Sequence, residues 1–507
     1  MSSAFRRTLP ARADLEQQKK QAKELLTAHK RGDDDARARV RSELPNKSPI
    51  TLADVQFVLA REYGFASWRA LKEHIETQAA ELLPPIDQLK RAMRRSEADI
   101  VRGLLERHAS LRTVINEPIF GFDSPALVTV GNKPDIVDVL LEYGADPNRK
   151  STWWAGGFHP LYGASPAVAE RLLRAGAVVD ACAAAHLDRV DLLATLLEEN
   201  RERVHERGGD GQTPLHFARS REVADLLLQA GADIDARDLD HRASPAEWMI
   251  DGRGELARYL VERGAPADIF LASALGLTDR ATALVTADPT ILELRTGQGQ
   301  YAPRDPSSFH IYLWTIGPNF TPLQTASKFG QRDTVRALLS LATPTQRLLF
   351  ACHEGAGDDA RAIVRANPGI VDRLTGPDRH ALTDAAWTGN SPAVALMVEL
   401  GLDPSIPSGA GAGAGNALHC AAWQGSAASV AALLAHSSGR ALVNSREPTH
   451  QGTPLGWCCH GSTNCGDPRA DHAEVARLLI AAGAKVDPKM DGCSDEMQAV
   501  LLEAVGS

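Results

Sequence analysis

One recurring segment limits what this chain can fold into more than any other feature. A sequence beginning Thr-Pro-Leu occurs in the segments 213–216, 321–324 and 453–456. Most copies, including degenerate ones, are followed about ten residues later by a stretch rich in valine and leucine, such as 223–228. Several of these stretches end in Gly-Ala-Asp, as at 231–233, or in a close variant. Repetition at this scale favours an array of similar units over one large globular core.

Each part of the repeated unit has a physical role. Threonine before proline opens a short helix, because the threonine can cap it and the missing proline N–H costs nothing in the first turn. Gly-Ala-Asp closes a second helix, with glycine in the left-handed cap and aspartate in the turn that follows. The run of leucines at 226–228 is too apolar for an isolated helix pair, so we expect each unit to be buried against the next copy.

These residues resemble the ankyrin repeat, which has the signature Thr-Pro-Leu-His-x-Ala and a period near 33 residues. The match is strongest over residues 213–235. The resemblance implies an all-α fold, an ankyrin-repeat solenoid of paired helices with β-turn loops, with about ten or eleven repeats over residues 86–488. Other paired-helix solenoids lack the Gly-Ala-Asp turn.

The two ends of the chain differ from its middle. Residues 1–80 have helical patterns without the features of the repeat, and the string 61–72 resembles the helical leader that precedes ankyrin arrays in many bacterial proteins. We therefore expect a small helical N-terminal module ahead of the array, in a position to cover an exposed terminal repeat. Residues 489–507 are expected to form a C-terminal capping helix.

Two segments interrupt the repeats. The first, 297–320, is an insertion rich in ring side chains in a chain that is only 5% aromatic. Those side chains are Tyr301, Phe309, His310, Tyr312 and Trp314. Aromatic residues favour an ordered, docked loop over a disordered one. The second segment, 408–415, alternates glycine and alanine and is expected to be a flexible turn.

The resemblance also implies that the short first helices line a concave groove, with one groove position two residues before the glycine that ends each helix. In this sequence that column contains Lys328, His353, Trp387, Trp423 and His460. Helices in adjacent repeats pack about 10 Å apart, so these side chains are expected to form one strip. A partner, a ligand, the 297–320 insertion or ordinary repeat packing can cover the two tryptophans, and the sequence leaves these possibilities open.

Three aromatic residues outside the column complete the predicted binding set, namely Trp457, Tyr312 and Trp314. Asp384 precedes Trp387 by one helical turn, so both are expected on one face. A carboxylate beside an indole in a groove can have a raised pKa and act as a general acid or base. A surface or capping role for Asp384 is nevertheless the favoured interpretation.

Two more clusters of side chains are candidate sites. Trp153 and Trp154, with His159, lie in an irregular early repeat, where they either pack over the distortion or form a second contact surface. The segment 458–472 contains three cysteines and two histidines but lacks the Cys-x2-Cys spacing typical of zinc sites. Adjacent cysteines on a helix point apart, so we expect core cysteines there and no metal site.

Composition excludes several classes of protein. With 44% hydrophobic residues, the 507-residue chain is not disordered as a whole, and a net charge of −9 argues against a general nucleic-acid binder. No apolar run is long enough to span a membrane, and no apolar signal core follows the first residues. Seven scattered cysteines do not form a disulfide framework. These features indicate a soluble cytoplasmic protein with no nucleic-acid or membrane partner and no cofactor.

Two functions fit this sequence. The first is a non-catalytic binding protein that recognises a protein partner in the groove, with Trp387 and Trp423 as anchors. The alternative is an enzyme or small-molecule binder whose pocket is closed by the 297–320 loop, with His353, Asp384 and His460 as acid–base groups. The sequence favours the first function, and it identifies neither the partner, the substrate nor the oligomeric state.

Overall fold

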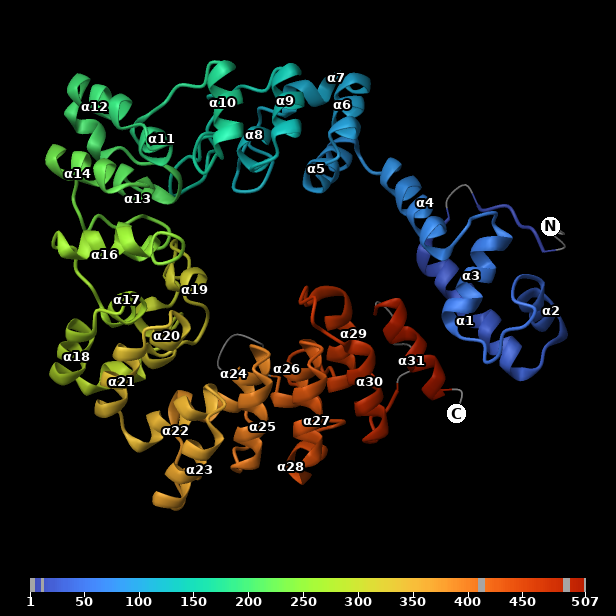
Figure 1. Cartoon of the computed structure of the whole chain (residues 1–507). Helices are drawn as coiled ribbons and strands as arrows, with labels where there is room; N and C mark the ends of the chain where they lie inside the picture. Colours follow the sequence, from blue (N-terminus) through green and yellow to red (C-terminus); the bar gives the residue numbers. More distant parts are fainter. Residues whose placement is uncertain (1–4, 11–12, 409–414, 487–492, 506–507) are drawn as a thin grey trace. The chain divides into compact units, whose positions relative to one another are not determined.

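The computed structural model describes residues 5–10, 13–408, 415–486 and 493–505 (Figure 1). Regular structure in these ranges is helical, and β pairing is limited to the isolated bridges Phe120–Ser124 and Arg304–Ser307. The fold class is therefore all-α, as predicted. Residues 409–414 of the glycine-rich segment, and 489–492 and 506–507 of the expected capping helix, lie outside the described residues.

The chain divides into two compact units. Unit 1 combines residues 1–83 with 347–507, and unit 2 comprises residues 84–346. No helix in the described ranges is both long enough and apolar enough to cross a lipid bilayer.

The first part of unit 1 is a small helical module. Thr51 begins one of its helices with a capping box, in which its side chain and that of Asp54 bind each other's backbone N–H groups. Arg39 forms a bidentate ion pair with the buried Glu62, at 2.8 and 2.9 Å. The helices of the module are α1 (Leu15–Arg31), α2 (Asp34–Glu43), α3 (Leu52–Glu62) and α4 (Trp68–Glu81).

The rest of unit 1 is a series of helix pairs. In Figure 1 the first helices α24, α26 and α29 lie side by side in one layer, and α25, α27 and α30 lie in a second layer. The helices are α22 (Pro344–His353), most of which falls in this unit, α23 (Gly357–Ala366), α24 (Ala381–Trp387), α25 (Ser391–Glu399), α26 (Ala417–Trp423), α27 (Ala427–Ala435), α28 (Ser437–Arg440), α29 (Pro454–Asn464), α30 (His472–Ala481) and α31 (Asp495–Val505), with a 3-10 turn at Gly376–His380.

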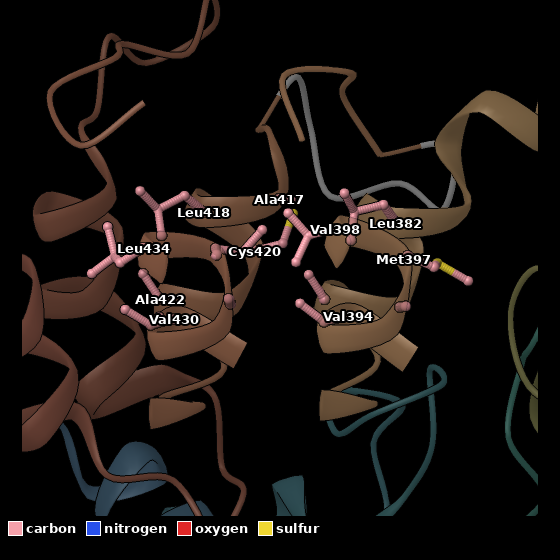
Figure 2. Packing of buried hydrophobic residues seen from close by; sticks show 14 of the residues in the cluster. Leu382, Val394, Met397, Val398, Ala417, Leu418, Cys420, Ala422, Val430 and Leu434 are labelled. Atoms are coloured by element: carbon pink, nitrogen blue, oxygen red, sulfur yellow. The ribbon is translucent and has the colours of Figure 1, made fainter. Parts of the chain in front are cut away.

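Neighbouring pairs share one hydrophobic core. Figure 2 shows Leu382 and Val398 of one pair packed in the same cluster as Leu418 and Val430 of the next. Fully burying such a side chain stabilises the fold by about 1.5–3 kcal/mol. A single helix pair cannot bury its apolar side chains by itself, because it has no neighbouring pair to cover them. Stacking is therefore what stabilises each copy.

Unit 2 has the same paired design with more interruptions. Its α-helices are α5 (Pro85–Arg95), α6 (Ala98–Arg107), α7 (Ala109–Val114), α8 (Ala126–Thr129), α9 (Pro134–Glu142), α10 (Pro166–Arg174), α11 (Ala181–His186), α12 (Val190–Glu199), α13 (Pro214–Phe217), α14 (Arg221–Ala230), α15 (Pro245–Trp248), α16 (Gly254–Glu262), α17 (Ile269–Leu275), α18 (Thr278–Ala287), α19 (Tyr312–Thr315), α20 (Pro322–Lys328) and α21 (Arg332–Leu341). Short 3-10 turns lie at Arg201–His205, Gly209–Gly211, Pro289–Glu293 and Gly299–Tyr301.

The residues predicted to begin and end helices have these roles in the structure. Thr213 and Thr321 form capping boxes with the residue three positions later, and Thr453 caps α29. The glycine of the Gly-Ala-Asp motif at 231 ends α14 with a φ of 100°, in the left-handed region that glycine adopts at little cost.

Candidate functional site

Three tryptophans from consecutive helix pairs of unit 1 lie in contact. Trp387 ends α24 and Trp423 ends α26, and their rings stack with centroids 6.2 Å apart and planes 29° apart. Trp457 of α29 meets Trp423 edge-on at 6.1 Å. His460, one turn later, lies 5.1 Å from Trp423. We call these four side chains the ring ladder, and it contains four of the predicted binding residues.

The side chains of the ring ladder are only partly buried. All three indoles are half-buried, while His460 is exposed. Trp387 and Trp457 pack against the hydrophobic core of this unit. A Cβ atom at Gly415 would lie 2.6 Å from the Trp457 ring, so glycine at this position gives the indole its space. The rings are thus anchored on one side.

Backbone contacts between repeats fix the spacing of the ladder. The Trp387 carbonyl accepts a hydrogen bond from the Gln424 side chain, and the Trp423 carbonyl accepts one from His472 Nε2 at 2.9 Å. Trp387 lies two residues before a left-handed glycine, Gly389, as the column predicts. His460 differs, because α29 continues past it to Asn464.

The other candidates of unit 1 lie in more enclosed surroundings. His353 is half-buried at the end of α22, and burial lowers its pKa, so the ring is mainly neutral at pH 7. Asp384 is buried, and its Oδ1 accepts a hydrogen bond from Ser408 Oγ at 2.8 Å. The structure therefore ties Asp384 to the loop that follows its helix pair.

Lys328, Tyr312 and Trp314 belong to unit 2. The Lys328 ammonium donates to the Ile316 carbonyl and lies 5.3 Å from the centre of the Phe320 ring, so it holds the end of the insertion. Tyr312 is fully buried, and its ring cannot touch a partner in this structure. Trp314, by contrast, is 55% exposed.

The insertion 297–320 is docked on its own unit through two buried tyrosines. Tyr312 and Tyr301 donate to the two oxygens of Asp268, at 2.8 and 2.7 Å. Asp268 also caps α17 by accepting from a backbone N–H. Burial, and then the neighbouring Glu247 carboxylate, raise the pKa of Asp268. Hydrogen bonding to a buried acid gives the loop a single position.

The docked insertion forms one wall of a cavity of about 1050 Å3 in unit 2. Three tryptophans line it, Trp153 and Trp248 from the array and Trp314 from the insertion. Phe122, also on the wall, is 63% exposed and adopts a φ of 56°, which is unusual for a residue with a large side chain. Strained backbone and exposed rings at one cavity are typical of a binding site.

Two carboxylates and an imidazole meet on this wall. Asp210, Asp240 and His241 each present an atom within 4.8 Å of the others. The Asp210 Oδ2 and His241 Nε2 atoms are 3.9 Å apart, and Trp153 Nε1 donates to Asp210 Oδ1 at 3.1 Å. Burial raises the pKa of Asp210 to about 6, with His241 opposing the shift and Asp240 adding to it.

Sequence reasoning missed this group. It identified Trp153 as part of a possible contact surface and Trp314 as a binding residue, but not the acids between them. Asp210 and Asp240 are separated by a whole helix pair, and the insertion follows about 60 residues later. The sequence does contain one signal for a polar site, the close spacing of Asp238, Asp240 and His241 in one turn. No spacing rule connects that turn with Asp210.

Two adjacent cysteines of the segment 458–472 lie in the core, as predicted. Cys458 and Cys459 are buried in the core, and all seven cysteines of the chain are free thiols. Within the described residues, the group of His, Cys, Asp and Glu side chains close enough to share one ion is the one formed by Asp210, Asp240 and His241.

Comparison with known proteins identifies one repeat. Residues 210–239 match the family model of the ankyrin repeat. The chain is also similar to alpha-latrocrustotoxin-Lt1a of Latrodectus tredecimguttatus, with 30% identity over 131 residues. That match covers 25% of this chain and 7% of the toxin, so the chain spans only a small part of the length of this relative. The chain thus contains an ankyrin repeat, a module typical of protein–protein interaction.

Proposed function

We propose that this chain is a non-catalytic binding protein that recognises a polypeptide partner through the ring ladder. The observation that carries the proposal is the contact between Trp387, Trp423 and Trp457, from three consecutive helix pairs. In this proposal the repeats extend over residues 86–488, and the ladder belongs to the groove formed by their first helices.

The physical case rests on what the rings offer a partner. Tryptophan is enriched among the residues that dominate binding energy, because it brings a large apolar area with few rotatable bonds. Anchoring by the core and by Gly415 means that little further ordering is needed when a partner binds. His460, exposed and 5.1 Å from Trp423, supplies a polar neighbour at the rim. In this proposal His353, at the end of α22, supplies another.

The test compares two matched variants of the full chain. The partner is isolated by cross-linking in the source cells and identified by mass spectrometry, and its affinity is then measured with purified components. Trp387→Ala with Trp423→Ala is expected to weaken binding about 1000-fold, since two anchors at about 2 kcal/mol each are removed. The control is Trp154→Ala, which removes an indole of unit 2 that is 45% exposed.

The outcome depends on both affinity and folding. The proposal requires that the double variant keeps its helical circular dichroism and a cooperative melting transition. Equal loss of binding in Trp154→Ala, or unchanged binding in the double variant, would show that the partner binds elsewhere. A collapse of the melting transition would show that the indoles act mainly in the core.

A second candidate function is small-molecule binding or catalysis in the cavity of unit 2. The observation that favours it is the insertion wall, where Trp314 faces a cavity of about 1050 Å3. In this alternative the acid–base groups are Asp210, Asp240 and His241, because these residues line the cavity. Native mass spectrometry separates the two functions, since a retained small molecule lost in Trp314→Ala supports the cavity.

A further inference from the structure

The three polar side chains on the cavity wall come from two turns that are joined through the backbone. The Asp210 carbonyl accepts hydrogen bonds from the N–H groups of Leu239 and Asp240, at 2.8 and 3.2 Å. Asp210 itself adopts a φ of 57° in the turn before α13. These contacts hold two carboxylates side by side, an arrangement that like charges oppose unless a positive group lies between them.

Each of the three residues has one polar atom fixed from outside the group. Trp153 Nε1 donates to Asp210 Oδ1 at 3.1 Å, and the Ser308 N–H donates to Asp240 Oδ1 at 2.9 Å. His241 Nδ1 lies 2.9 Å from both the Phe309 carbonyl oxygen and Ser308 Oγ. Because the carbonyl oxygen can only accept, the tautomer that satisfies it carries its hydrogen on Nδ1. In this tautomer Nε2 has the lone pair, and it lies 3.9 Å from Asp210 Oδ2.

This arrangement is the one that metal-binding side chains require. A ligating histidine almost always donates its other ring N–H to a carbonyl or carboxylate, which fixes both the tautomer and the ring. The ring of His241 is held further by Trp248 and Trp314, at centroid distances of 5.3 and 4.7 Å. Asp238 has a different role, because its oxygens accept from the His241 and Ala243 N–H groups and from Trp248.

We propose that Asp210, Asp240 and His241 bind a divalent transition-metal ion on the wall of the unit 2 cavity. Their ligand atoms, one nitrogen and two oxygens within 4.8 Å of one another, can approach one ion. A mixed imidazole and carboxylate set suits zinc, manganese, iron or cobalt, whereas calcium and magnesium prefer oxygen ligands alone. With three protein ligands, the ion keeps open positions toward the cavity for water or a donor group of a ligand.

The proposal does not depend on the function of the ring ladder, which belongs to the other unit. The competing explanation is a simple ion pair between a protonated His241 and Asp210. An ion pair predicts no stoichiometric metal binding, whereas the proposed site predicts one ion per chain.

The experiment titrates the full chain, stripped with chelator and dialysed, with zinc, manganese or cobalt chloride in an isothermal calorimeter. At least one of these ions is expected to bind with a stoichiometry of one and to raise the melting temperature. His241→Gln and Asp210→Asn are each expected to weaken that binding by more than about tenfold. Trp153→Phe, which removes only the outer hydrogen bond, is expected to weaken it by about tenfold.

Two controls keep the result interpretable. Cys465→Ser removes the partly exposed thiol of the cysteine-rich segment and is expected to leave the metal affinity unchanged. Cobalt absorption should show nitrogen and oxygen coordination, without the intense near-ultraviolet band of a thiolate ligand. Should Asp210→Asn fail to fold without metal, Asp240→Asn replaces it as the second ligand variant.

Three results would overturn the proposal. The first is the absence of binding by all three ions to a folded chain. The second is binding that both His241→Gln and the aspartate variant leave unchanged. The third is binding that disappears in the cysteine-segment control, because the ion would then belong to unit 1.

Discussion

The ring ladder of unit 1 and the cavity of unit 2 are both rich in tryptophan, yet they are built in opposite ways. Trp387 and Trp423 occupy the same position of successive repeats, so regular stacking alone brings their rings together. Trp153 and Trp314 lie in irregular segments, and only the docked insertion places them on one cavity. A regular repeat thus produces an extended surface, whereas an interruption of the repeat produces a hollow lined by distant parts of the chain.

Replacing a glycine by alanine should lower the free energy of unfolding far more near the cavity of unit 2 than in unit 1. Gly156, close to the cavity, has a φ of 148°, and a Cβ atom there would lie 2.2 Å from the Gly208 carbonyl oxygen. We expect Gly156→Ala to destabilise the chain by about 3 kcal/mol or more, because two backbone segments must move apart. Chemical denaturation measures the loss. Gly389→Ala in unit 1, which meets nothing within 4 Å, should cost only about 1 kcal/mol.

Acid should weaken unit 2 through two buried histidines. Burial lowers the pKa of both His159 and His216 to about 4, from an unfolded value near 6.5. Their Nδ1 atoms accept backbone N–H groups, from Leu161 and Thr213, which a protonated ring cannot do. A lowered histidine pKa means that stability is full above pH 6.5 and falls between pH 6.5 and 4.

The expected loss by pH 4 is about 3 kcal/mol for each histidine, measured by urea unfolding across that range. His216→Gln should remove the contribution of His216 to the pH dependence of the unfolding free energy and leave the contribution of His159. An unchanged pH profile in this variant would mean that His216 titrates normally in the folded chain.

The docking of the insertion should depend on its hydroxyl groups. Tyr312→Phe keeps the ring but removes a donor to the buried Asp268, which we expect to cost about 1–3 kcal/mol and to increase protease cleavage within 297–320. The matched control is Tyr259→Phe, whose hydroxyl also binds an aspartate, Asp225, but at the surface. That control should leave the melting temperature unchanged, and a similar loss in both variants would contradict the docking argument.

The smallest expected difference in stability is between substitutions of single tryptophans in the two units. Trp248 donates from Nε1 to Asp238 at 2.8 Å, so Trp248→Phe should cost about 1–2 kcal/mol. Trp423→Phe keeps an aromatic ring in the ladder and should cost less than about 1 kcal/mol. Thermal unfolding of the two variants, side by side, tests whether tryptophan in unit 2 is held by polar contacts and in unit 1 by stacking.

The same contrast explains what the sequence could predict. Thr213, Thr321 and Gly231 act locally, so their roles as caps followed from spacing alone. The contact of Trp387 with Trp423 followed from the groove column that the resemblance to the ankyrin repeat implies. The group of Asp210, Asp240 and His241 forms where irregular turns of the array contact the docked insertion. The period of the repeat does not predict such a contact.

Two predicted binding residues illustrate the limit in more detail. Tyr312 and Trp314 are two positions apart in one short helix, α19, and both looked equally suited to contact a ligand. Tyr312 is buried on Asp268, and Trp314 faces the cavity. The Tyr312 ring is directed by the buried Asp268, and the Trp314 ring packs on His241. Both partners are far away in the sequence, and composition does not reveal them.

The docking of the insertion also constrains how this gene can change. Its contacts reach back from Ser308 and Phe309 to Asp240 and His241, with the helix pair α15–α16 and the pair α17–α18 in between. Duplicating or deleting a repeat inside that stretch would separate the loop from these hydrogen-bond partners. Unit 1 has no described contact of this kind around α24 to α27, so we expect homologous arrays to vary in length there and to keep a fixed number of repeats between residues 240 and 308.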